Sequence, residues 1–246
     1  MIEIIDLYKS FGKLKVLKGI NLSLKRGEIT AIIGRSGSGK TVLVKHIVGL
    51  LKPDKGKILI DGEDVTKAKN KALKRIRHKF GMLFQEGALF DYMTVGENVA
   101  FPLKEHTKLS EKEIKKVVRE KLELVGLKGV EKKLPNELSG GMKKRVALAR
   151  AIALEPEIVI YDEPTTGLDP ITSVSIYELI KDMQKRLNIT SIIITHDVPD
   201  VFAVADKVAV LHEGKIIAYD TPQNIMKIDD LNIKALLLAR LKFLKQ

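Results

Sequence analysis

One glycine-rich segment limits what this chain can fold into more than any other feature. It lies between an apolar run at 29–33 and a predicted helix from Lys40 to about Leu50, and it reads Gly34-Arg35-Ser36-Gly37-Ser38-Gly39-Lys40-Thr41. This segment matches the pattern G-x-x-x-x-G-K-[ST], in which glycines let successive backbone N–H groups point at phosphate oxygens. The helix N-terminus adds a partial positive charge. We expect Lys40 to reach the β- and γ-phosphates and Thr41 to offer a hydroxyl to Mg²⁺.

Two acidic residues follow a second apolar strand. The run IVIY is apolar throughout, and Asp162 and Glu163 come directly after it. Ligands of parallel sheets bind at the carboxyl ends of the strands. We therefore expect Asp162 to reach the Mg²⁺ held by Thr41, and Glu163 to polarise the water that attacks the γ-phosphate. His196 ends a third buried strand and could hydrogen-bond a γ-phosphate oxygen, although a capping role is the alternative for a lone histidine.

The alternation of apolar runs and helical segments predicts an α/β fold with a parallel core sheet. Strands are expected at 2–7, 20–24, 29–33, 58–60, 158–161 and 191–194, with a hairpin over 208–219. Helices are expected at 67–79, which is strongly basic, at 172–187, and from Leu231 to the C-terminus.

A helical block at 95–155 interrupts this alternation. Within it, Ser110 and Glu113 predict a capping box at a helix start, and Gly126 predicts a helix end. We therefore predict one domain over 1–246, with an inserted helical subdomain at about 88–155 and a C-terminal helical extension at 221–246.

Composition excludes several classes of site. The 246 residues include no cysteine, which excludes disulfides, zinc–thiolate sites, iron–sulfur clusters and a cysteine nucleophile. The sequence shows neither a signal-peptide pattern nor an apolar stretch of ~18 residues, so we expect a soluble, cytoplasmic chain. The net charge of +12 suits an anionic partner such as nucleotide, nucleic acid or lipid headgroups, and a solvated lysine-rich surface is the alternative.

A further motif, Leu138-Ser139-Gly140-Gly141-Met142, lies at the start of a predicted helix. The order of phosphate loop, LSGG at a helix start, apolar run with Asp-Glu, and histidine resembles the ATP-binding-cassette (ABC) ATPases over residues 1 to about 220. The resemblance implies a P-loop NTPase core with an N-terminal antiparallel β subdomain and an inserted α-helical subdomain. It also implies ATP hydrolysis with Mg²⁺.

The resemblance assigns roles to further residues. Phe11 is similar to the aromatic residue that stacks on adenine, and Gln85 to the glutamine that reaches Mg²⁺ and the attacking water. Gly167-Leu168-Asp169 resembles the loop that communicates across a dimer, and His196 matches the switch histidine. Ser139, Gly140 and Gly141 match the motif that binds the γ-phosphate of ATP held by a second copy, which implies a homodimer around two ATP molecules. Met142 replaces the commoner glutamine and Phe11 the commoner tyrosine, and neither change removes a catalytic group.

Longer segments resemble the ATPases of Mla-type (MCE) phospholipid transport systems. They are the stretches at 84–106, 137–171 and 195–216. The resemblance implies a peripheral protein on the cytoplasmic face of the inner membrane, with an integral permease, an MCE-type lipid-binding protein and a small accessory protein as partners. The apolar stretch at 87–93 would receive the permease, with ordinary core packing as the alternative. The C-terminal helix would contact a second subunit or the accessory protein, or else pack on its own domain.

Three other functions are alternatives to phospholipid transport for a chain with these motifs. An ABC transporter for lipoproteins or amino acids differs from the phospholipid reading only in the longer segments. A soluble ABC ATPase of DNA repair or translation usually carries coiled-coil insertions or tandem cassettes, and this chain has neither. It also lacks an aromatic-studded basic strand, so no nucleic-acid partner is expected. A binding-only cassette is disfavoured by the presence of both Glu163 and His196.

Overall fold

The computed structural model describes residues 1–238 and forms two compact units. The first comprises Met1–Lys79 and the chain from Thr190 onward, and the second comprises Phe80–Ile189. The predicted helical subdomain at 88–155 falls inside the second unit, and its bounds stay a prediction. Among the helices of the described residues, none combines the length and the apolar character that crossing a bilayer requires.

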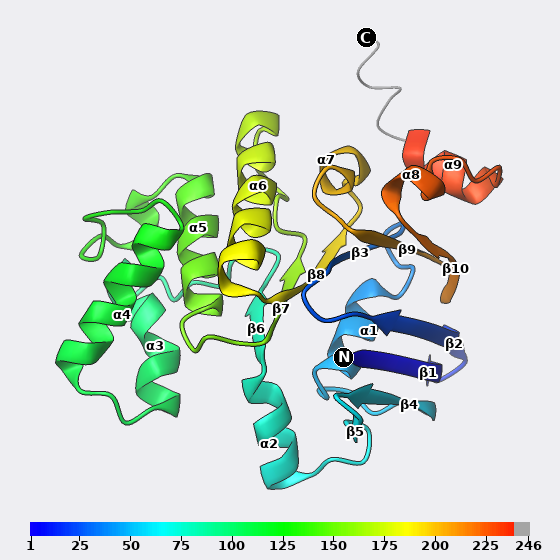
Figure 1. The fold of residues 1–246 in the computed structure, drawn as a ribbon, viewed down its shortest axis with the longest axis horizontal. Helices are drawn as coiled ribbons and strands as arrows, with labels where there is room; N and C mark the ends of the chain where they lie inside the picture. Colours follow the sequence, from blue (N-terminus) through cyan, green and yellow to red (C-terminus); the bar gives the residue numbers. More distant parts are fainter. Residues whose placement is uncertain (239–246) are drawn as a thin grey trace. The chain divides into compact units, whose positions relative to one another are not determined.

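The first unit contains two groups of strands (Figure 1). An antiparallel sheet has the order β2-β1-β4-β5, with bounds β1 Ile2–Phe11, β2 Leu14–Leu24, β4 Lys55–Ile60 and β5 Glu63–Asp64. A second group has the order β10-β9-β3-β8, with bounds β3 Ile29–Ile33, β8 Thr190–Thr195, β9 Lys207–His212 and β10 Lys215–Asp220. In this group β3 pairs in parallel with β8 and β9, whereas β10 is antiparallel to β9. The helices are α1 Lys40–Ile47, α2 Asn70–His78, α7 Val198–Phe202, α8 Pro222–Ile225 and α9 Leu231–Leu238.

Burial explains why these strands form where they do. Every residue of β3 and β8 is buried, and the apolar residues that make up most of β3 and the centre of β8 are typical of strands covered on both faces. In β1 and β2, buried and exposed positions largely alternate, which is the pattern of a sheet with one solvated face. These two strands extend beyond the predicted bounds, because Phe11 pairs with Leu14 across a tight turn and the flanking polar residues continue the ladder.

The second unit pairs two parallel strands with a group of helices. The strands are β6 Phe80–Leu83 and β7 Ile158–Asp162. The helices are α3 Val95–His106, α4 Glu111–Leu124, α5 Gly140–Ala151 and α6 Pro170–Leu187, with a short 3₁₀ turn at Pro135–Glu137. Helices α3, α4 and α5 pack against one another (Figure 1).

Local capping confirms the predicted start and end of α4. Ser110 accepts a hydrogen bond from the Glu113 N–H while the Glu113 carboxylate accepts from Ser110, which is the predicted capping box. Gly126, with φ of 72°, follows the last turn as predicted. Helix α6 begins two residues before the prediction, because Asp169 caps it and Pro170 is compatible with the first helical position.

The C-terminal prediction is described in part. Helix α9 begins at Leu231 as predicted and is described to Leu238. Ile233 is buried, whereas Leu231 is exposed. Leu241 and Leu244, which we also assigned to this helix, lie outside the described residues.

Candidate functional site

The phosphate-binding segment lies in the first unit, between β3 and α1. Strand β3 ends at Ile33 and α1 begins at Lys40, so the predicted strand–loop–helix context is present. The Lys40 ammonium donates to the carbonyl oxygens of Gly34, at 2.7 Å, and Arg35, at 3.2 Å. The loop therefore curls around the cation that we expect to meet the phosphates.

Two glycines of this loop are required by geometry. A Cβ at Gly34 would lie 2.3 Å from the backbone oxygen of Leu211, which no side chain could tolerate. Gly39 caps α1 with φ of 107°, in the left-handed region that favours glycine. Thus the loop closes tightly on β9 and leads into the N-terminus of α1, the end of a helix that favours an anion.

Ser38 offers a second feature that suits phosphate. Its side chain is buried, and within residues 1–238 its hydroxyl oxygen has no hydrogen-bond partner. A buried hydroxyl without a partner costs free energy, and a phosphate oxygen would remove that cost. The loop therefore fits a nucleotide phosphate by its backbone, its lysine and this hydroxyl.

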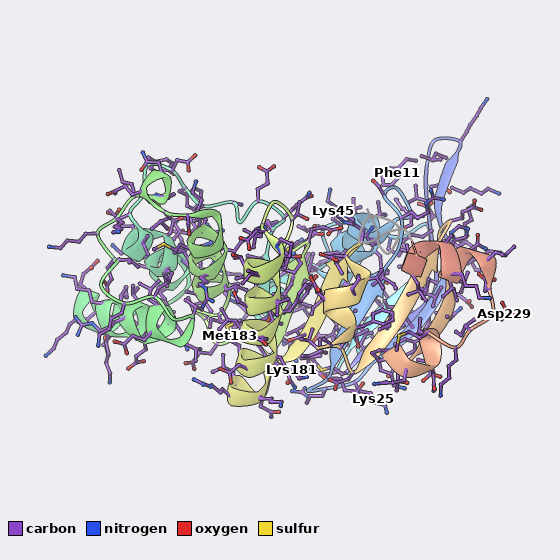
Figure 2. All side chains as sticks on the ribbon, turned by 90° about the horizontal axis from the view of Figure 1, so that it is seen from above. Phe11, Lys25, Lys45, Lys181, Met183 and Asp229 are labelled. Atoms are coloured by element: carbon purple, nitrogen blue, oxygen red, sulfur yellow. The ribbon has the colours of Figure 1, made fainter. Side chains whose placement is uncertain are left out.

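His196 and Phe11 complete the predicted residues of the first unit. Because Ile33 pairs with Thr195 in the parallel ladder of β3 and β8, Gly34 and His196 leave the sheet at the same end. His196 is exposed there. Phe11 ends β1 with 47% of its surface exposed, and Figure 2 shows it at the surface of this unit. The Lys9 ammonium lies 5.5 Å from the centre of the Phe11 ring.

The acidic residues and Gln85 lie in the second unit. Leu83 pairs with Tyr161 in the parallel ladder of β6 and β7, so Gln85 and the Asp162–Glu163 pair leave their strands at the same end. Gln85 is exposed, and both carboxylate residues are half-buried. Glu163 has φ of 49°, a left-handed backbone that costs a non-glycine residue about 1–3 kcal/mol.

The Ser139-Gly140-Gly141 motif forms the tip of α5. The Ser139 hydroxyl caps the helix by accepting from the Met142 N–H at 3.3 Å, and both glycines open the first turn. A Cβ at Gly141 would lie 2.7 Å from Cγ2 of Thr172, and one at Gly140 would lie 3.2 Å from Cδ2 of Leu168. The structure thus brings this motif against the predicted dimer-communication loop and the start of α6.

Asp169 of that loop is fixed in place by its own helix. Its carboxylate accepts from the hydroxyl of Thr172 at 2.5 Å and from the Thr172 N–H at 3.0 Å. These hydrogen bonds lower the pKa of Asp169, so the carboxylate stays ionised at the N-terminus of α6. In this structure its visible role is capping.

The apolar segment at 87–93 is held by two polar side chains. The amide of Asn98, which is fully buried, accepts from Phe90 N–H and donates to the carbonyl oxygens of Phe90, Met93 and Thr94. The Arg150 guanidinium donates to the carbonyl oxygens of Gly87 and Ala88. Three aromatic side chains in and around this segment are exposed, namely Phe84, Tyr92 and Phe101 at 44%, 78% and 36%, and the last two both contact the ring of Phe90.

One residue of this unit was missed by the sequence analysis. Lys144 on α5 is 5% exposed, and its ammonium donates to the carbonyl oxygens of Gln85 and Glu163. Lys144 was missed because it stands within the basic run Lys143-Lys144-Arg145, which is typical of an exposed helix face. The available signal was spacing, because Lys144 precedes the buried Ala147 and Leu148 by three and four positions.

Similarities to known proteins identify the family. Residues 17–166 match the ABC transporter family. The chain is 46% identical to the intermembrane phospholipid transport system ATP-binding protein MlaF of Haemophilus influenzae, over 95% of this chain and 88% of that protein. It is 43% identical to the probable ribonucleotide transport ATP-binding protein mkl of Mycobacterium leprae, over 97% of this chain and 69% of that protein.

Solved structures agree on the fold. The chain resembles cbiO1 from Clostridium perfringens, with a TM-score of 0.86, 37% identity, and coverage of 99% of this chain and 98% of that one. It also resembles the cassette MJ0796 in a dimeric post-hydrolysis state bound to ADP and Pi, with a TM-score of 0.81, 32% identity, and coverage of 90% and 99%. These matches confirm the predicted cassette fold, with its antiparallel β subdomain and helical insert. The chain belongs to the ABC transporter family, as a subunit that binds and hydrolyses ATP.

Proposed function

We propose that this ATPase powers the movement of phospholipid between bacterial membranes through a partner permease. The observation that carries the proposal is the resemblance of the segments at 84–106 and 137–171 to the Mla-type ATPases, and the 46% identity to MlaF over 95% of the chain supports it. In this role the chain lies peripherally on the cytoplasmic face of the inner membrane. An MCE-type lipid-binding protein and a small accessory protein belong to the same assembly.

A second cargo has support of its own. The similarity to mkl, whose name assigns it to ribonucleotide transport, is 43% over 97% of the chain. The two identities are too close to choose a cargo by themselves. We favour phospholipid because the segments at 84–106 and 137–171 resemble the Mla-type ATPases, and lipoprotein or amino-acid transport stays a weaker alternative.

The residues fit ATP and Mg²⁺ by their chemistry. Lys40, Ser38 and the N–H groups of the 34–41 loop suit phosphate oxygens, and Phe11 offers a ring to the adenine. The Thr41 hydroxyl, the Asp162 carboxylate and the Gln85 amide are the oxygen ligands that Mg²⁺ prefers. When bound, Mg²⁺ neutralises phosphate charge and orients the phosphates for attack.

The remaining residues act on the attacking water and on the terminal phosphate. The Glu163 carboxylate orients the water and accepts its proton as the water oxygen bonds to the γ-phosphorus and the bond from that phosphorus to the leaving ADP oxygen breaks. His196 donates a hydrogen bond to a γ-phosphate oxygen. In the closed homodimer, Ser139, Gly140 and Gly141 of a second copy supply helix-tip N–H groups to the same phosphate. ATP binding therefore favours the closed dimer, and hydrolysis releases it.

The permease is proposed to dock on the exposed aromatic side chains of Tyr92 and Phe101, which flank Phe90, together with the exposed Phe84. An exposed apolar patch is a common mark of a protein interface. Because Asn98 and Arg150 fix the backbone beneath it, movement of the Gln85 segment would be transmitted to the docked permease.

Purification from native membranes tests this function. We expect an affinity-tagged chain, extracted in mild detergent, to bring down a permease, an MCE-type protein and glycerophospholipid, identified by mass spectrometry. Tyr92→Asp should lose the permease and keep ATP binding, whereas Leu50→Asp, at a surface position 56% exposed in the first unit, should keep both. A permease recovered with a ribonucleotide-binding component, and without phospholipid, would contradict the phospholipid proposal.

A further inference from the structure

Lys144 is a buried lysine placed between two segments of the candidate catalytic site. It is 5% exposed on α5, and its ammonium donates to Gln85 O and to Glu163 O, the latter at 3.4 Å. A buried ammonium is stable only when it is hydrogen-bonded or paired with charge. Both of its carbonyl partners belong to residues that we assign to ATP hydrolysis.

The backbone that Lys144 holds at Glu163 is strained. Glu163 has a left-handed φ of 49°, and such conformations persist only where surrounding contacts enforce them. Its carbonyl oxygen accepts from the Thr166 N–H at 3.4 Å as well as from Lys144. The direction in which the Glu163 carboxylate points depends on this turn, so it depends on the contacts that hold the turn.

Charge also favours this placement. The groups that face the Lys144 ammonium are the carboxylates of Glu86, Glu163 and Asp162. Burial lowers the pKa of Lys144, and these three charges oppose that shift. The ammonium thus places a positive charge beside Gln85, Asp162 and Glu163, the residues that we propose to bind Mg²⁺ and to orient the attacking water.

We propose that Lys144 is a positioning residue that clamps the Gln85 segment and the Glu163 turn to the helix whose tip is Ser139. The inference rests on the proposed roles of Gln85, Glu163 and Ser139. Lys144 lies five residues along the same rigid helix from Ser139, about 7.5 Å at the usual helical rise. Contact of the α5 tip with nucleotide is thereby linked to the placement of the catalytic groups in the same subunit.

A purely structural lysine in the same unit provides a matched control. Lys121 on α4 is 6% exposed and pairs with Glu155 at 2.8 Å. Neither Lys121 nor Glu155 has a proposed role in hydrolysis. Replacing Lys121 by methionine removes a buried charge of the same kind without touching Gln85 or Glu163.

The test measures steady-state ATP hydrolysis of the full chain with Mg²⁺. We expect Lys144→Met to lower kcat by about 10- to 100-fold while KM for ATP stays within about twofold, because orientation is lost and nucleotide contacts remain. Lys144→Arg keeps the charge and its donors, so kcat should return to within about fivefold of the parent. Lys121→Met should keep the parental kcat even though it lowers the unfolding temperature.

Hydrogen exchange supplies a readout that does not depend on turnover. Amides at 84–88 and 163–166 should exchange about fivefold or more faster in Lys144→Met, and at the parental rate in Lys121→Met. The inference is overturned if Lys144→Met keeps the parental kcat, or if Lys144→Arg is as impaired as Lys144→Met with no change in exchange at these segments. Failure of the underlying function is separate, because Glu163→Gln would then retain the parental rate of hydrolysis.

Discussion

Lys40 is the side chain of the 34–41 loop that we expect to bind the triphosphate directly. It is 9% exposed, and its ammonium donates to the carbonyl oxygens of two successive residues, Gly34 and Arg35. These bonds hold the positive charge at the mouth of the loop, next to the first N–H groups of α1. Because electrostatic attraction strengthens as water is excluded, this one charge should contribute much of the affinity for the triphosphate.

Replacing Lys40 by alanine tests this contribution. We expect Lys40→Ala to weaken ATP binding by about 10- to 150-fold, the equivalent of about 1.5–3 kcal/mol for a charged hydrogen bond. Lys45→Ala, on the same helix but exposed, should bind ATP like the parent. Titration calorimetry measures both dissociation constants, and equal values for the two variants would remove Lys40 from the site.

At the scale of elements, the sequence located β3, β7 and β8 through their apolar residues, whereas β6, the short strand that leads to Gln85, was not predicted. The strand at 29–33 was predicted with its observed bounds, because a wholly apolar run leads directly into the glycine loop. The arms of β1 and β2 were missed, since polar residues such as Lys9 and Ser10 join a hairpin ladder without an apolar signature. The Lys144 contacts were missed because two carbonyl groups from distant segments define them, and no local pattern encodes that meeting.

Helix α1 also contains a buried titratable group, His46. It is 1% exposed, and its Nδ1 lies 2.7 Å from the Val42 carbonyl oxygen. Burial lowers the pKa of His46, with the Lys9 charge lowering it further, while hydrogen bonds to backbone and the charge of Asp54 act in the opposite direction. The unfolded chain therefore binds a proton at His46 more readily than the folded chain does.

This difference predicts a dependence of stability on pH. The contribution of His46 to the free energy of unfolding is fully present above its unfolded pKa of about 6.5. It is lost as the pH falls from there towards the lower pKa of the folded chain. We expect the free energy of unfolding, from urea titrations, to drop less between pH 7 and 5.5 in His46→Asn than in the parent. His78→Asn, at an exposed position of α2, should keep the parental slope. A parental slope in His46→Asn would show that His46 does not cause the loss.

At the scale of the whole molecule, each chain carries two helix tips that we propose as anion sites. The phosphate loop lies in one compact unit, and the Ser139 helix tip lies in the other. Solved relatives of this fold include a dimer bound to ADP and Pi, at 32% identity. We infer that nucleotide held by the loop of one copy is also contacted by the helix tip of a second, so that ATP binding and dimer closure are the same event.

Light scattering of Glu163→Gln with saturating ATP and Mg²⁺ tests whether two copies share the nucleotide. The substitution keeps the shape of the side chain and removes the proton acceptor, so ATP should bind and persist. We expect a species of about twice 27.4 kDa with ATP, and a monomer without it. Adding Ser139→Arg to this variant should abolish the dimer while ATP binding is retained. A Glu163→Gln protein that stays monomeric with ATP bound would contradict the shared nucleotide site.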